Sequence, residues 1–141
     1  MKRNTYGALT MLALAFLISI PMAQAQTRLQ ADVPFAFSLG QSAMSAGEYE
    51  INSAGQDLLL IRNSGANEAQ LLVKSQYVQG RDAGRPRLVF HKYGDQYFLS
   101  QIWDGNSNIG VELPVSHREK EIKMAGAAFP RGAQTVIVAM K

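Results

Sequence analysis

The sequence predicts an all-β protein: a small single domain of about seven or eight strands, built as an antiparallel sandwich or barrel, with one short helix near the C-terminus. Short runs in which apolar and polar residues alternate recur along the chain. These runs are rich in β-branched and aromatic residues, and Gly or Asn separates them. The one clear capping pattern for a helix lies near the C-terminus.

The first half of the chain supplies four predicted strands. Residues 33–39 (VPFAFSL) alternate around two phenylalanines and are followed by a Gly-Gln turn. Residues 48–52 (EYEIN) alternate sharply between an apolar and an acidic face. Residues 57–62 (DLLLIR) are nearly continuously apolar, so we expect that strand to be covered on both faces or bent. Residues 68–79 (EAQLLVKSQYVQ) predict a long strand with room for a bulge.

A hairpin is predicted over residues 87–103. Its strands, residues 87–93 and 96–103, are separated by Gly94-Asp95, which suits a type II′ turn and also tolerates type I′. In that register one face carries Leu88, Phe90, Tyr97 and Leu99, and the other carries Val89, His91, Phe98 and Ile102. Both faces are largely apolar, so we expect the hairpin to lie in the middle of the fold.

The C-terminal part predicts a strand, a helix and a final strand. Residues 109–115 (IGVELPV) form the first strand. Ser116 and Glu119 match a capping box, so we expect a helix over residues 117–125 that ends at Gly126. Residues 133–140 (AQTVIVAM) are apolar enough to pair with a neighbouring strand.

Residues 1–25 resemble a secretory signal peptide. Lys2 and Arg3 precede an uncharged, mostly apolar run that ends at Pro21, and Ala23-Gln24-Ala25 fits a cleavage site. The run is shorter than the roughly 20 residues that span a bilayer, which favours cleavage over a membrane anchor. We therefore expect export to the periplasm or the medium, with residues 26–141 as a single β domain that is not an integral membrane protein.

Charge and composition narrow the range of possible functions. The mature 116 residues keep 12 of the 14 basic and all 11 acidic residues, a net charge of +1, and no block of Lys or Arg occurs. This pattern gives no support to nucleic-acid binding. The chain has no cysteine, which excludes disulfides, thiol chemistry and cysteine-based zinc sites.

Three blocks of the chain carry a family resemblance. They are VPFAFSLGQSAMSAGEYEI (33–51), RPRLVFHKYGDQYFLSQIW (85–103) and LPVSHREKEI (113–122). Together they resemble a family of small exported proteins from acidobacteria and similar soil bacteria. The resemblance implies a signal peptide and a β architecture, and it implies no activity, cofactor or ligand.

The sequence contains few motifs typical of catalysis or metal binding. His91 and His117 are the only histidines, and a His117–Glu121 pair is a weak metal signal. Asp104, Asn106 and Asn108 follow calcium-loop spacing, but Ile109 and Val115 replace the required Gly and Glu. The chain has no G-x-S-x-G elbow around a serine and no Gly-rich phosphate loop. We therefore expect no catalytic residue, no metal site and no cofactor.

The aromatic cluster of the hairpin is the candidate ligand site. Tyr93, Tyr97 and Trp103, with Asp104, would present rings to a sugar or cap an apolar pocket. Trp103 ends its strand beside Asp104, so we expect it to be partly exposed. The alternative is that all three rings seal the edge of the core.

The sequence thus leaves three hypotheses. The first is an exported, non-enzymatic β domain that binds an envelope glycan or an apolar small molecule. The second is a small hydrolase of envelope material that uses a histidine and a nearby acid. The third is a structural protein whose exposed strand edge pairs with a copy of itself, giving a homo-oligomer.

Overall fold

The computed structural model describes residues 28–74, 76–81, 84–126 and 132–141. The predicted signal peptide, residues 1–25, lies outside these ranges. The described part contains eleven strands and one helix: β1 (Leu29–Val33), β2 (Phe37–Leu39), β3 (Ser42–Met44), β4 (Gly47–Ser53), β5 (Leu58–Asn63), β6 (Ala69–Val73), β7 (Gln76–Gln79), β8 (Arg87–Tyr93), β9 (Gln96–Trp103), β10 (Ile109–Glu112), α2 (His117–Gly126) and β11 (Gln134–Ala139).

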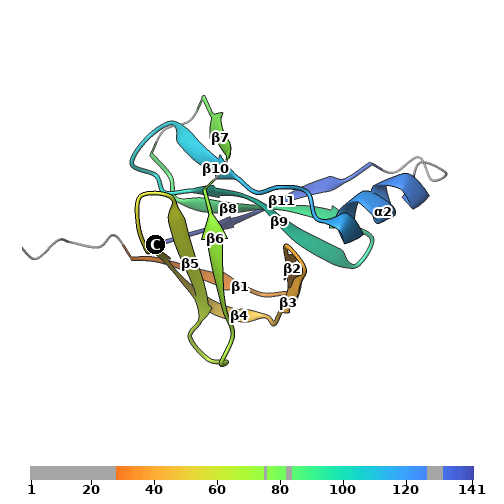
Figure 1. Cartoon of the computed structure of the whole chain (residues 1–141), viewed down its shortest axis with the longest axis horizontal. Helices are drawn as coiled ribbons and strands as arrows, with labels where there is room; N and C mark the ends of the chain where they lie inside the picture. The colour runs from red at the N-terminus through yellow and green to blue at the C-terminus, as the bar shows by residue number, and fades with distance from the viewer. Residues whose placement is uncertain (1–27, 75, 82–83, 127–131) are drawn as a thin grey trace, which may run out of the picture.

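The strands form two sheets, which confirms the predicted all-β, sandwich-like fold (Figure 1). Sheet A has the order β1-β4-β5-β6, and sheet B has the order β11-β8-β9-β10-β7. The short β2–β3 hairpin joins sheet B through a parallel contact between Ser38 and Phe98. The two sheets meet where the C-terminus reaches β1, through a bridge between Ala31 and Met140.

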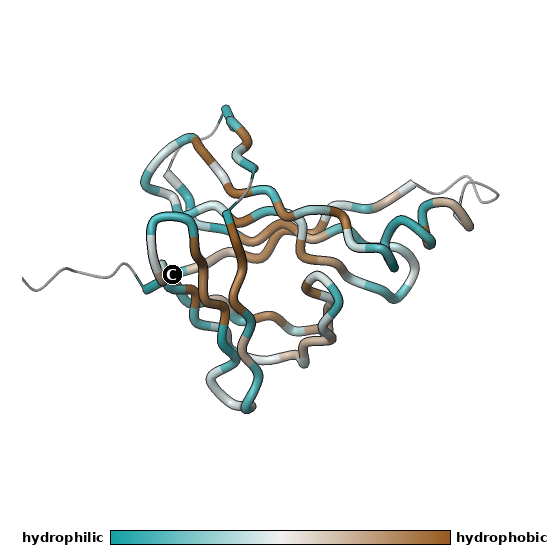
Figure 2. The backbone as a smooth tube through the Cα atoms, in the orientation of Figure 1, coloured by the Kyte–Doolittle hydropathy of each residue, from teal (hydrophilic) through white to brown (hydrophobic). Residues whose placement is uncertain are grey.

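The core lies between the inner faces of the two sheets, where Figure 2 shows hydrophobic segments facing each other. Its most buried side chains come from both sheets and from β2. They are Ala31, Val33, Leu39, Tyr49, Ile51, Ile61, Leu88 and Phe90. At about 25 cal/mol per Å² of buried apolar surface, this inter-sheet burial is the main source of stability in a chain without disulfides.

The central hairpin has the predicted turn and, near the turn, the predicted register. Gly94 has a φ of +59° whereas Asp95 has no positive φ, as a type II′ turn requires. Pairing runs from Tyr93–Gln96 to Phe90–Leu99 as expected, and then shifts between Val89 and Phe90.

The shift leaves Ser100 as an extra residue on β9, so Ile102 pairs with Leu88 and points into the core. The prediction that Ile102 shares a face with Val89, His91 and Phe98 is therefore wrong. The same bulge places Trp103 on the outer face of sheet B.

Other strand boundaries differ from the prediction. β1 was not predicted, although Leu29, Ala31 and Val33 alternate with polar residues and all three face the core. The predicted strand over residues 33–39 is interrupted over residues 34–36, so Val33 ends β1 and Phe37 begins β2. The predicted strand over residues 68–79 is two strands in different sheets, because the chain leaves sheet A after Val73.

The helix is where the capping pattern places it. The Ser116 Oγ accepts a hydrogen bond from the Glu119 N–H at 3.1 Å, as an N-cap does. The Glu119 carboxylate does not return to Ser116. It is buried against sheet B instead, and it is the only buried residue of α2.

Candidate functional site

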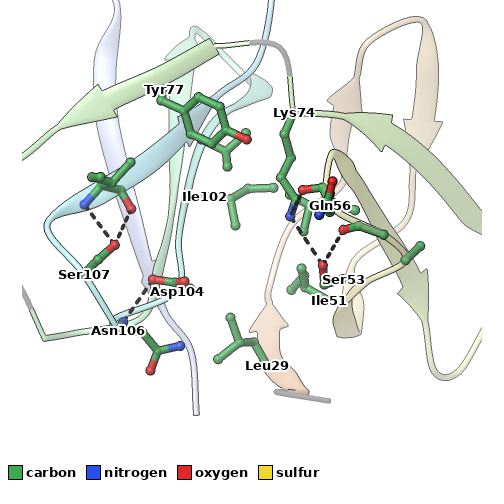
Figure 3. Close-up of a pocket in the computed structure, with 15 residues that line it drawn as sticks. Leu29, Ile51, Ser53, Gln56, Lys74, Tyr77, Ile102, Asp104, Asn106 and Ser107 are labelled. Atoms are coloured by element: carbon green, nitrogen blue, oxygen red, sulfur yellow. Dashed lines mark hydrogen bonds between the residues drawn. The ribbon is translucent and has the colours of Figure 1, made fainter. Parts of the chain in front are cut away.

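A pocket opens between the two sheets at the end of the sandwich where the β4–β5 and β9–β10 loops lie (Figure 3). Its volume is about 780 Å³, within the range that accommodates small-molecule ligands. Sheet A supplies one wall, mainly through β4 and Lys74. Sheet B supplies the other through Tyr77, β9 and β10.

The pocket floor is apolar and its rim is polar. Leu29, Ile51, Leu59, Ile102 and Val111 form the floor, which continues the core of the sandwich. The rim carries Ser53, Gln56, Lys74, Tyr77, Asp104, Asn106 and Ser107. Such a pocket favours a ligand that has both an apolar part and hydrogen-bonding groups.

Lys74 and Asp104 place one charge of each sign on opposite walls (Figure 3). The Lys74 Nζ donates to Ser53 Oγ at 3.3 Å and to the Gln56 carbonyl at 3.0 Å. The Asp104 Oδ1 accepts the Asn106 N–H at 3.0 Å. Neither belongs to the ion pairs between described residues, so each retains hydrogen-bonding capacity toward a ligand.

Two large apolar side chains at the pocket are exposed. Tyr77 has 57% and Ile109 has 49% of its surface accessible. Tyr77 pairs with Val111, which itself pairs with Ile102, so its ring stands on the inner face of sheet B. A ligand in the pocket would cover both side chains and remove apolar surface from water.

Of the four residues predicted for the ligand site, only Asp104 lines this pocket. The expectation that Trp103 is partly exposed is wrong, because its exposed fraction is 5%. Its ring packs over Gly110, where a Cβ would lie 2.6 Å from ring atoms, and over Gly80, where a Cβ would lie 2.7 Å away. The Arg87 guanidinium covers the ring at 4.6 Å from its centroid.

The two tyrosines are separated by the sheet. Tyr97 points inward and stacks on Phe35 with ring centroids 3.8 Å apart. Tyr93 points outward, and its hydroxyl donates to the Glu119 Oε1 at 3.0 Å. The structure therefore does not bring the predicted aromatic cluster together on one surface.

A second polar cluster lies on the outer face of sheet B beneath α2. The Glu119 Oε1 receives both the Tyr93 hydroxyl and the His91 Nδ1, the latter at 2.8 Å. The Glu119 side chain is 5% exposed and that of His91 is 29% exposed. Burial, together with the hydrogen bond to Glu119 and its charge, raises the pKa of Tyr93 to about 12.

The hydrolase hypothesis requires a histidine that contacts both an acid and a nucleophile, and this cluster can be compared with that requirement. His91 is within hydrogen-bond reach of an acid, but the only hydroxyl bonded in the cluster, that of Tyr93, contacts the carboxylate and not the imidazole. Ser100 is buried at the bulge of β9, and its carbonyl accepts the Leu113 N–H. The cluster forms no part of the pocket lining.

The weak metal motifs form local contacts. His117 pairs with Glu121 at 3.2 Å on the exposed side of α2. Asp104 bonds the backbone of Asn106, as in an ordinary Asx turn. Among the described residues, no three His, Asp or Glu side chains gather in a way that would hold a metal ion.

Sequence reasoning missed Lys74, Tyr77 and the apolar residues of the pocket floor. The available signal was the strand-like run over residues 68–79, which contains both Lys74 and Tyr77. That signal was incomplete, because the switch of sheets after Val73 decides which of these residues face the pocket.

No protein-family model, curated protein or solved structure matches the chain. In the part of the chain that the structure describes, no helix has both the length and the apolar character needed to cross a membrane.

Proposed function

We propose that this protein is an exported, non-enzymatic domain of the bacterial envelope that binds a small amphipathic ligand in the inter-sheet pocket. The observation that carries the proposal is the combination of an apolar floor with a mixed donor and acceptor rim. The signal-peptide pattern of residues 1–25 supports export.

An envelope glycan fragment is the ligand class we favour. Lys74 donates, Asp104 accepts, and Asn106 and Ser107 do both, which suits a neutral molecule with several hydroxyl groups. The Tyr77 ring adds an exposed aromatic surface on which a sugar face can stack. An apolar small molecule is the second candidate, supported by the contiguous side chains Ile51, Ile102 and Val111.

A thermal-shift screen of the purified protein tests the proposal. Its panels are cell-wall oligosaccharides, fatty acids and lipids, with divalent metals as a separate panel. A ligand that binds only the native state raises the melting temperature by mass action, by an amount that grows with its concentration. A glycan shift favours the first class, and a fatty-acid or lipid shift favours the second.

Pocket variants then locate the site. Tyr77→Ala and Asp104→Asn should each reduce the ligand-induced shift while changing the melting temperature of the ligand-free protein little, because both residues are exposed. Ile137→Ala is the matched control, since Ile137 is equally exposed but on β11, outside the pocket lining. A ligand whose shift survives both pocket variants binds elsewhere and contradicts the assignment.

A further inference from the structure

The edge of sheet A formed by β6 carries no partner strand among the described residues. β6 pairs with β5 on one side only. The Asn63 N–H donates to the Glu68 carbonyl, and the Lys74 N–H donates to the Asp57 carbonyl. Because alternate residues of an antiparallel strand direct their backbone groups to opposite edges, Ala69, Leu71 and Val73 direct theirs away from β5.

The same three residues expose apolar side chains on the outer face of sheet A. Leu71 is 57% and Val73 is 60% exposed. They pair with Leu60 and Leu58 of β5, which are half-buried. The four aliphatic side chains therefore form one patch that ends at the open edge of the sheet.

β6 lacks the features that protect edge strands. Its sequence, Ala-Gln-Leu-Leu-Val, has no charge and no proline, and its pairing with β5 is regular. The other end of the sheet differs, because β1 is bonded to the C-terminus, with the Lys141 N–H donating to the Gln30 carbonyl at 2.8 Å.

The flanking charges make this edge complementary to itself. Glu68 precedes β6 and Lys74 follows it, at equal distances from Leu71. In an antiparallel pair of two β6 strands centred on Leu71, Leu71 faces its own copy, Ala69 faces Val73, and Glu68 faces Lys74. A two-fold interface of this kind brings together the same patch from both copies.

Contacts with β3 and with the adjacent Ser45 leave the edge accessible. The Gln70 Nε2 donates to the Ser42 Oγ at 2.8 Å, and Glu68 accepts the Ser45 N–H at 2.9 Å. Gln70 pairs with the buried Ile61, so these side chains depart from the inner face of the sheet. The backbone groups of Ala69, Leu71 and Val73 lie in the plane of the sheet instead.

We propose that two copies of this chain associate through β6, forming a continuous eight-stranded antiparallel sheet from two copies of the four-stranded sheet A. The observations that carry the proposal are the unpaired edge, the aliphatic patch beside it and the opposed charges of Glu68 and Lys74. Lys74 also lies on the rim of the pocket, but the dimer is tested through Leu71, which is not part of the pocket lining.

Cysteine cross-linking provides the sharpest test, because the chain contains no cysteine of its own. Facing residues in a hydrogen-bonded antiparallel pair have Cα atoms about 5.5 Å apart, within disulfide range. Leu71→Cys should therefore give a covalent dimer on mild oxidation of the purified protein. Ala69→Cys alone should not, but a mixture of the Ala69→Cys and Val73→Cys proteins should.

Ile137→Cys is the control for random collision, since Ile137 is 61% exposed on β11. Cross-linking of Ile137→Cys or of Ala69→Cys alone at the rate of Leu71→Cys would overturn the proposed register.

Light scattering after size exclusion measures the oligomeric state without a cross-link. We expect a concentration-dependent dimer whose dissociation constant rises at least about tenfold in Leu71→Lys, because the two lysines would face each other. Ile137→Lys should leave the dimer intact. A monomer at every concentration, or a dimer that Leu71→Lys does not weaken, would contradict the proposal.

A competing peptide distinguishes binding of a second copy of the chain at the β6 edge from binding of a different partner there. The peptide with the sequence of residues 68–74 (EAQLLVK) should shift the protein from dimer to monomer, and a scrambled peptide should not. Equal competition by both peptides would show an edge that accepts any extended chain, and would rule out self-recognition.

Discussion

The two faces of the β8–β9 hairpin serve different purposes. On the outer face, Trp103 and Tyr93 are covered by glycines, an arginine and helix α2, and their polar atoms are bonded within the protein. On the inner face, Ile102 leads into a pocket whose polar rim retains hydrogen-bonding capacity. Aromatic density thus marks a packed surface here, while the candidate ligand site combines an aliphatic floor with a polar rim and lies between the two sheets.

Trp103→Ala is the variant for which this contrast predicts the largest change in the free energy of unfolding. Removing a ring that fills the space above Gly110 and Gly80 should lower the free energy of unfolding by about 3–5 kcal/mol. Urea denaturation measures the effect. Tyr77→Ala, which removes an exposed ring at the pocket, should cost less than about 1 kcal/mol and serves as the control. Equal losses would show that Trp103 is not a packing residue.

Glu119→Ala tests the polar cluster of the outer face. The substitution leaves the Tyr93 hydroxyl and His91 without their shared acceptor, and we expect a loss of about 1–3 kcal/mol in the free energy of unfolding. Glu121→Ala is the matched control in the same helix, because its ion pair with His117 is exposed and should contribute little. Similar losses in both variants would mean that the cluster does not anchor α2.

Tyr93→Phe gives the smallest expected effect and depends on pH. The pKa of Tyr93 is about 12 in the folded protein and near 10.0 when unperturbed. Its contribution to stability is therefore complete below pH 10 and is lost as the pH rises toward 12, because the unfolded chain releases the proton first. Between these values the stability of the unmodified protein should fall more steeply than that of Tyr93→Phe.

Urea midpoints at several alkaline pH values measure the difference. The pKa of Tyr49 is also raised by burial, but Tyr49 titrates in both proteins and cancels. Parallel pH profiles would contradict a raised pKa of Tyr93 in the folded protein.

Local patterns were sufficient to predict the fold class, the central hairpin with its turn, and the capped helix. Alternation identified β4, β8 and β9, and the Ser116 cap located α2. What could not be predicted depended on contacts between distant residues. The bulge at Ser100 reversed the expected face of Ile102, and only the pairing of Ile102 with Leu88 reveals it.

The candidate site was less predictable than the fold for the same reason. Asp104 was predicted because it lies beside Trp103 at the end of the 87–103 hairpin. Tyr77 and Lys74 were not predicted. Their positions at the pocket depend on the chain passing from β6 in sheet A to β7, which pairs with β10 in sheet B. Burial of Trp103 depended on two glycines, Gly80 and Gly110, that come from different segments.

The hydrogen bonds between Gln30 and Lys141 join β1 to a residue far along the chain. Sheet A therefore gains these backbone bonds only when two segments far apart along the polypeptide have come together. Such a contact has to overcome the loop-closure entropy of the whole intervening chain, so we expect it to form late in folding.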